Sequence, residues 1–294
     1  IFLDYSYNFA VRNFRHGSFG NVTKIDNTRQ VKNSESFFSV AAGMPLAHRG
    51  VFLIRANGGH VNYRYDSDEL FADDTDHSRY SFFGIKAELA RNTLDKFLYP
   101  RRGSDLKLSG IFVTGRDKYE PFDAKKFLSR TPRQWFGARF TWDKYFDMPG
   151  CSWLSLGLNV DGVITNHPEF TTEGATVMSM PAYEPVPHAQ MIYMPDFRGR
   201  RFAAGGIMPT FDLMHNFFLR TGFYAMFREK RSFVPGVSGP VEDKRWHYIA
   251  EASLVYHTPI GPVSLALTKY DLRNWKNMYL TFNFGYAIFA PKGT

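Results

Sequence analysis

The stretch "MYLTFNFGYAIF", residues 278–289, decides the class of fold. Every second position from Met278 to Ile288 is large and apolar, whereas Thr281 and Asn283, which lie between those positions, are small or polar. A period of two is the period of a β-strand, whose successive side chains point to opposite faces of the sheet. One wholly apolar face indicates a strand with lipid on its outer side and a polar lumen on its inner side.

Two further stretches alternate in the same way. In "WFGARFTWDKYF", residues 135–146, aromatic residues such as Phe136 and Phe140 are expected to face outward and Asp143 inward. In "FFGIKAELA", residues 82–90, Glu88 is expected inward. A soluble sandwich would also alternate, but its apolar face would be the inner one. Charged inner positions and aromatic outer positions favour a barrel in a membrane.

Composition supports this interpretation. Aromatic residues make up 17% of the 294 residues, with 29 Phe and 16 Tyr, while charged residues make up only 22%. Transmembrane barrels carry such rings in two interfacial girdles. Mean hydropathy is −0.32, and no apolar run approaches the roughly 18 residues that a spanning helix needs. Because only helices and closed barrels satisfy the backbone in lipid, we predict an all-β, antiparallel transmembrane β-barrel.

Strands and connections follow a regular plan. Fourteen strands are predicted near residues 2–14, 35–46, 51–65, 80–96, 104–119, 133–147, 151–165, 173–182, 188–194, 202–213, 217–228, 246–257, 263–270 and 278–289. The predicted long connections are 15–34, 66–79, 120–132, 166–172, 195–201, 229–245 and 271–277, and the short ones are 47–50, 97–103, 148–150, 183–187, 214–216 and 258–262. Long outer loops that alternate with short periplasmic turns are typical of outer-membrane barrels.

The whole of residues 1–294 is predicted to be one outer-membrane barrel domain. The chain begins "IFLDYSYNF", with neither an initiator Met nor the parts of a signal peptide. We therefore expect a processed or partial chain that lacks an upstream soluble domain and a first hairpin. A closed barrel of fourteen strands remains an alternative, because that number is even.

The stretch "FRGRRF", Phe197–Phe202, lies in a long connection that precedes the last five predicted strands. An arginine is permanently charged and offers five donors, so in a narrow lumen it can fasten a loop to acidic or carbonyl partners. Gly199 allows the tight bend that presents it. This stretch resembles the [V/I]-R-G-[F/Y] motif of the superfamily that includes the BamA and TamA assembly barrels and the two-partner secretion transporters.

That resemblance implies a sixteen-stranded barrel in its intact form, with this loop folded into the lumen. Phe197, Arg198 and Gly199 take the apolar, Arg and Gly places of the motif, and Arg200 stands where an aromatic residue is usual. Arg220 stands where the family has the acidic partner on the wall. The candidate lumen partners of Arg198 are therefore the other inward-facing acids, Glu251, Glu88 and Asp143.

Two more stretches carry the resemblance. The "NTLD…YPRRG" pattern over residues 92–103 resembles a periplasmic turn of the superfamily, with Asp95, Pro100, Arg102 and Gly103 as its motif residues. The "NFGYAIF" ending, with Phe284, Gly285, Tyr286 and Phe289, is similar to the C-terminal pattern that the barrel-assembly machinery recognises. Together with residues 181–190 and 256–267, the turn looks like the barrel attached to bacterial patatin-like phospholipases.

The leading functional hypothesis is a membrane-anchoring and translocating barrel of a patatin-like outer-membrane protein, with its lipid acyl hydrolase domain upstream. The alternatives are an assembly or secretion barrel of the BamA, TamA or two-partner type, and a passive barrel or structural subunit. Whether the protein is an enzyme stays open, because neither "GCSWL" at 150–154 nor "GVSGP" at 236–240 completes the G-x-S-x-G elbow. No catalytic residue is expected in this chain.

Cofactors, metals and partners follow from the same interpretation. No cofactor is expected, and no metal, because the acidic stretch at 66–77 lacks the spacing of a calcium loop. The expected partners are outer-membrane lipids and glycolipids, and the barrel-assembly machinery during biogenesis. The net charge of +8 is scattered along strands and loops, which argues against nucleic acid. A homo-oligomer and a subunit of a larger complex both remain open.

Overall fold

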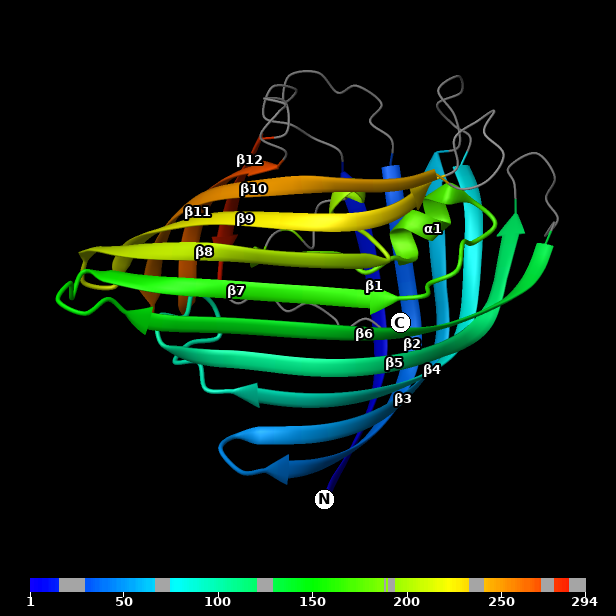
Figure 1. Cartoon of the computed structure of the whole chain (residues 1–294), viewed down its shortest axis with the longest axis horizontal. Helices are drawn as coiled ribbons and strands as arrows, with labels where there is room; N and C mark the ends of the chain where they lie inside the picture. Colours follow the sequence, from blue (N-terminus) through cyan, green and yellow to red (C-terminus); the bar gives the residue numbers. More distant parts are fainter. Residues whose placement is uncertain are drawn as a thin grey trace.

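The protein forms one antiparallel sheet of twelve strands in sequence order (Figure 1). The computed structural model describes residues 1–15, 30–66, 75–120, 129–187, 189, 194–232, 241–270 and 278–285. The strands are β1 (Phe2–Arg15), β2 (Gln30–Leu46), β3 (Gly50–Asp66), β4 (Thr75–Asn92), β5 (Gly103–Glu120), β6 (Ser129–Asp147), β7 (Leu154–Thr165), β8 (Arg201–Met214), β9 (Phe217–Ser232), β10 (Val241–Thr258), β11 (Gly261–Tyr270) and β12 (Met278–Phe284).

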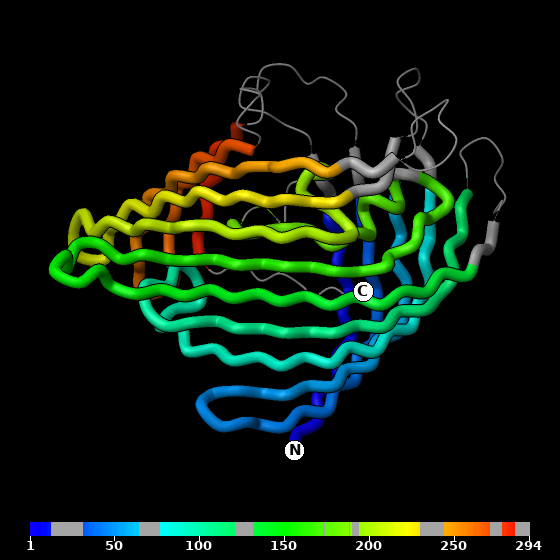
Figure 2. The backbone as a smooth tube through the Cα atoms, in the orientation of Figure 1, coloured from blue at the N-terminus to red at the C-terminus, as the bar shows by residue number. Residues whose placement is uncertain are grey.

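The strands continue as a meander around a curved wall (Figure 2). Each strand pairs with the next in an antiparallel ladder, from β1 with β2 to β11 with β12. Within the described ranges, no ladder joins β1 to β12. The prediction of an all-β, antiparallel transmembrane β-barrel is confirmed as a class of fold.

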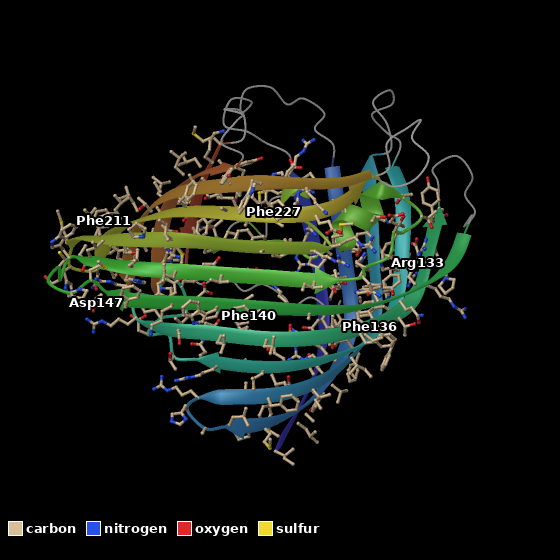
Figure 3. All side chains as sticks on the ribbon, viewed as in Figure 1. Arg133, Phe136, Phe140, Asp147, Phe211 and Phe227 are labelled. Atoms are coloured by element: carbon tan, nitrogen blue, oxygen red, sulfur yellow. The ribbon has the colours of Figure 1, made fainter. Side chains whose placement is uncertain are left out.

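The polarity of the wall is inverted relative to a soluble protein. Its outer face exposes large apolar side chains, among them Phe136 and Phe140, which are 63% and 40% exposed (Figure 3). Its inner face buries polar and charged side chains such as Glu35 and Asp117. Because exposed apolar surface is stable only against an apolar phase, this wall is built to stand in lipid. The alternation predicted in the three quoted stretches is confirmed for the described residues.

The described residues form twelve strands, whereas fourteen were predicted. Residues 173–182 and 188–194 were expected to be strands, but helix α1 (Glu173–Ser179) begins the first segment, and residues 188 and 190–193 lie outside the described ranges. Thr172 caps α1, since its hydroxyl oxygen accepts from the backbone N–H of Ala175 at 3.4 Å. Alternation failed here because the segment is enclosed by the wall, so apolar residues on several of its sides are buried.

One connection, residues 166–200, therefore joins β7 to β8 and carries both α1 and the short 3-10 helix η3 (Pro195–Phe197). In the described part of the chain, no helix has the length and apolar character needed to cross a membrane. Long and short connections still alternate, as predicted, because the number of strands is lower by two. The short turns are residues 47–49, 93–102, 148–153, 215–216 and 259–260. The predicted short turn at 183–187 instead lies within the long connection.

Candidate functional site

The described part of the β7–β8 connection lies within the space enclosed by the wall, as Figure 1 shows for α1. Phe170, Ala175 and Met178 pack against inward-facing residues of the first half of the sheet. These residues are Phe37, Val61, Tyr63, Tyr80, Phe82, Val113 and Trp135. Tyr183 and Phe197 pack against the second half, whose contributing residues are Tyr145, Val163, Phe202, Ala204, Met208, Tyr224, Met226, Ile249 and Tyr270. The connection thus joins both halves of the wall through apolar contacts.

Arg198 lies inside this packing, with only 7% of its surface exposed. Its Nη1 donates to the carbonyl oxygens of Met178 at 2.8 Å and Met180 at 3.2 Å. These carbonyls lie at the C-terminal end of α1, where a helix leaves its last carbonyls without partners and carries a partial negative charge. A guanidinium is a favourable partner there. The arginine of the motif therefore ties the second part of the connection to the end of α1.

The rest of the motif fastens the connection to the wall. Phe197 stacks edge-on against His247 and Tyr270. The backbone N–H of Gly199 donates to Pro181 O at 3.1 Å, and that of Arg200 donates to Glu229 O in β9 at 3.3 Å. The contacts of Phe197 and Arg200 hold the connection to β9, β10 and β11, and that of Gly199 joins two parts of the connection.

Two further charged residues, Arg228 and Asp196, complete this attachment. The sequence alone did not point to either of them. Arg228 of β9 is 2% exposed; its Nη1 donates to Arg198 O at 3.3 Å and its Nη2 to Asp196 Oδ1 at 3.0 Å. A charge-assisted bond of this kind is roughly twice as strong as a neutral one. Arg228 lies on the buried inner face of β9, and only the fold brings it to the motif.

The three acids predicted as partners of Arg198 each have a hydrogen bond or an ion pair with another residue. Glu251 Oε1 accepts from Ser253 Oγ at 2.5 Å, and Glu88 pairs with Lys86 at 2.5 Å. Asp143 accepts from Asn159 at 2.8 Å. The hydrogen bonds of Arg198 described above go to carbonyls, the second kind of partner that the sequence allowed. All three acids do face the interior, as their alternation predicted.

Arg220 of β9 is packed among aromatic rings. Its guanidinium carbon lies 5.6 Å from the ring centre of Tyr99 and 5.7 Å from that of Tyr145. Its Nη2 lies 2.8 Å from the sulfur of Met208. Cation–π contacts strengthen when they are withdrawn from water. Arg220 thus joins β9 to β6 and to the β4–β5 turn.

The β4–β5 turn, residues 93–102, is built around Asp95. Its Oδ1 accepts from the backbone N–H groups of Arg101 at 2.9 Å and Arg102 at 3.1 Å. Gly103 closes the turn with φ +101, a region that L side chains rarely adopt. Three of the four predicted motif residues, Asp95, Arg102 and Gly103, therefore meet in one turn. Pro100 is buried in the same turn.

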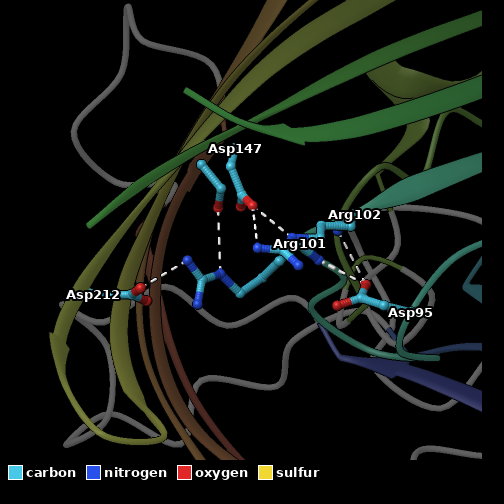
Figure 4. Close-up of polar contacts among 6 residues, drawn as sticks. Asp95, Arg101, Arg102, Asp147 and Asp212 are labelled. Atoms are coloured by element: carbon cyan, nitrogen blue, oxygen red, sulfur yellow. Dashed lines mark hydrogen bonds and ion pairs between the residues drawn. The ribbon is translucent and has the colours of Figure 1, made fainter. Parts of the chain in front are cut away.

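This turn also reaches across the short-turn edge of the wall (Figure 4). Arg101 pairs with Asp212 of β8 at 2.7 Å, and Arg102 pairs with Asp147 of β6. The hydroxyl of Tyr99 donates to Ser264 Oγ in β11 at 2.9 Å. The turn therefore connects β4 and β5 to the neighbouring strand β6 and to the distant strands β8 and β11, which the sequence did not predict.

The C-terminal pattern is only partly described. Phe284 is 61% exposed on the outer face, and Gly285 follows it with φ +77. Tyr286 and Phe289 lie outside the described residues. In the ranges that are described, no three His, Cys, Asp or Glu side chains are grouped to hold a metal ion.

His167, at the start of the connection, should make stability depend on pH. Burial lowers the pKa of His167 from 6.5 to about 3. The unfolded chain takes up this proton below about pH 6.5 and the folded protein only near pH 3, so the free energy of unfolding falls as the pH drops through that window. At about 1.4 kcal/mol per pH unit, the loss is about 2–3 kcal/mol at pH 4.5.

His167→Gln should remove that part of the pH dependence in denaturant titrations of the protein in detergent. His48→Gln, in an exposed turn, is the control and should leave the wild-type slope unchanged. An unaltered slope in His167→Gln would show that the imidazole is not held neutral by its surroundings.

Fold, polarity and filled interior together define the class of this chain as an antiparallel transmembrane β-barrel. No family model matches it, and no curated protein matches it. Among solved structures, it is similar to BamA from Haemophilus ducreyi lacking POTRA domains 1–3. That similarity has 9% identity and a TM-score of 0.47, and it covers 95% of this chain and 68% of that one. The β domain of the Bordetella autotransporter BrkA has 9% identity and a TM-score of 0.36, with 95% of this chain and 94% of that one covered.

Proposed function

We propose that this chain is the outer-membrane barrel of a bacterial protein that translocates or assembles polypeptides, with a lumen closed at rest by residues 166–200. The observation that carries this proposal is the buried Arg198, bound to carbonyls at the end of α1. A passive porin keeps a water-filled lumen. Here the connection packs against inward-facing residues of both halves of the wall.

The location follows from the polarity of the wall. Exposed apolar side chains lie on every strand from β1 to β12, including Phe9 of β1 and Leu280 of β12. A continuous apolar outer face fits the hydrocarbon of a bilayer, and barrels with long and short connections in alternation are those of the bacterial outer membrane. We infer outer-membrane lipids and glycolipids as contacts of this face. The barrel-assembly machinery is the inferred partner during biogenesis, through the pattern that includes Phe284 and Gly285.

The test of a closed lumen is conductance in planar lipid bilayers. The purified barrel should show a mostly closed state with brief, rare openings, because the connection must leave the lumen before ions can pass. A steady, ohmic conductance of porin size would refute the proposal and favour the passive barrel.

Anchoring of an upstream lipid acyl hydrolase is a finer form of this function. It rests on the resemblance of the β4–β5 turn, in which Asp95, Arg102 and Gly103 meet, together with residues 181–190 and 256–267, to the patatin-associated barrels. The test is the N-terminal sequence and mass of the protein purified from its native membrane. A G-x-S-x-G elbow before the barrel is the expected result, and several POTRA modules in its place would favour an assembly or secretion barrel.

A further inference from the structure

A cavity of about 610 Å³ lies between the β7–β8 connection and the inner face of the first half of the wall. Six cationic side chains line it but only three carboxylates do. The cations are Arg12, Arg55, Lys86, Lys107, Arg139 and Arg198, and the acids are Glu35, Glu88 and Glu184. Its size falls in the range of ligand pockets, roughly 300–1,000 Å³. Four of these cations pair with carboxylates, namely Arg12 with Glu35, Lys86 with Glu88, Lys107 with Asp105 and Arg139 with Asp161. Arg198 donates to carbonyls. This leaves Arg55 as the lining cation that can attract an anionic occupant.

Two of these cations face each other directly. In the β3–β4 ladder Arg55 is the register partner of Lys86, and both line the cavity. Like charges opposite each other across a ladder destabilise a sheet. Lys86 has Glu88 as a partner at 2.5 Å. Arg55 is different, because its Nε is buried and has no hydrogen-bond partner among the described residues.

A buried donor that has no hydrogen-bond partner and lies next to a like charge lowers stability unless an acceptor binds it. An anion placed between Arg55 and Lys86 would meet both needs. It would accept from the planar guanidinium fork and would screen the ammonium group.

The cavity is also graded along the strands. On β3, Arg55 is followed by Asn57 and then, four residues further along, by Val61. On β6, Arg139 lies four residues from Trp135. Trp135 is nearer than Arg139 to the long-connection edge of the wall, as Val61 is nearer than Arg55 on β3. Met178, at the end of α1, belongs to the same apolar cluster as Trp135 and Val61. The end of the cavity toward the long connections therefore offers apolar surface, beside the ion pair of Arg12 and Glu35 at the level of Val61. Arg55 and Lys86 lie further toward the other end.

We propose that this cavity binds a small amphiphilic molecule with a phosphate-type head group. Oxygens of the head group accept from Arg55 and Lys86, and the apolar part lies against Trp135 and Met178. The phosphate chemistry can come from a lipid head group or from a free phosphate compound. This inference does not depend on whether the barrel translocates polypeptides.

Isothermal titration calorimetry in a maltoside detergent tests the proposal. The probes are inorganic phosphate and dihexanoyl phosphatidic acid below its micellar concentration, each at ionic strength matched with sodium chloride. Arg55→Gln is the test variant and should weaken binding by about ten-fold or more, the loss expected for one charge-assisted hydrogen bond. Arg55→Gln also removes a like-charge pair, so we expect its unfolding midpoint without probe to equal or exceed that of wild type.

Arg64→Gln is the matched control, since Arg64 lies on the same strand but on its exposed face. It should bind both probes as wild type does. Binding of phosphatidic acid alone would identify the source as lipid, and comparable binding of phosphate would identify a free phosphate compound. The proposal is overturned if neither probe binds, or if Arg55→Gln and Arg64→Gln change the affinity equally.

Discussion

Arg198→Ala is expected to open the lumen. Without the guanidinium, the carbonyls of Met178 and Met180 lose the donor that holds the second part of the connection to α1. Hydrogen bonds from a charged donor contribute about 1.5–3 kcal/mol each, and buried carbonyls left without a donor add to the cost. The free energy of unfolding should fall by about 3 kcal/mol. Conductance in planar bilayers should change from brief openings to frequent, long ones.

The matched control is Arg201→Ala, at the start of β8. The side chain of Arg201 is 60% exposed and lies 3.8 Å from Glu229, and an exposed pair of this kind contributes about 0–1 kcal/mol. Conductance and unfolding should therefore stay near wild type. Arg198→Lys should fall between the two, because an ammonium group cannot reproduce a planar fork. If Arg198→Ala and Arg201→Ala behaved alike, the proposed role of Arg198 in closing the lumen would be wrong.

Gly103→Ala is expected to disrupt the β4–β5 turn and much of the wall beside it. A Cβ at this position would lie 2.2 Å from Thr93 O, in backbone that cannot move without breaking the ladder, and φ is +101. Left-handed strain costs roughly 1–2 kcal/mol, and overpacking typically adds 1–3 kcal/mol. The expected loss in the free energy of unfolding is about 3–5 kcal/mol, measured by urea titration in detergent.

Gly150→Ala separates the two causes of that loss. Gly150 also has a positive φ, +79, but a Cβ there would meet nothing within 4 Å. Only the left-handed strain applies, so its loss should be about 1–2 kcal/mol. Equal losses in the free energy of unfolding would mean that the close approach of Thr93 O to Gly103 does not contribute to the effect of Gly103→Ala.

The wall was predictable from the sequence because its information is local. Alternation at Phe136, Phe140 and Phe282 identified the outer face, and the lengths of the connections identified the two edges of the barrel. Both signals arise from the period of the strand and from lipid on one side of it, and neither depends on which strands meet. The predicted strand at 173–182 failed because that argument assumes a segment with one side in lipid. Only the cap at Thr172 could have indicated the helix.

What the sequence determined by itself was the class of fold, the inward direction of Glu88, Asp143 and Glu251, and the motif at Arg198. Only the tertiary structure decided the partners. Arg198 meets carbonyls of its own connection, Tyr99 reaches Ser264 across 165 residues, and Arg55 faces Lys86 across a ladder. A hydrogen bond needs two groups within about 3 Å, and such proximity between distant segments is fixed by strand register and chain packing, which the pattern of one strand does not contain.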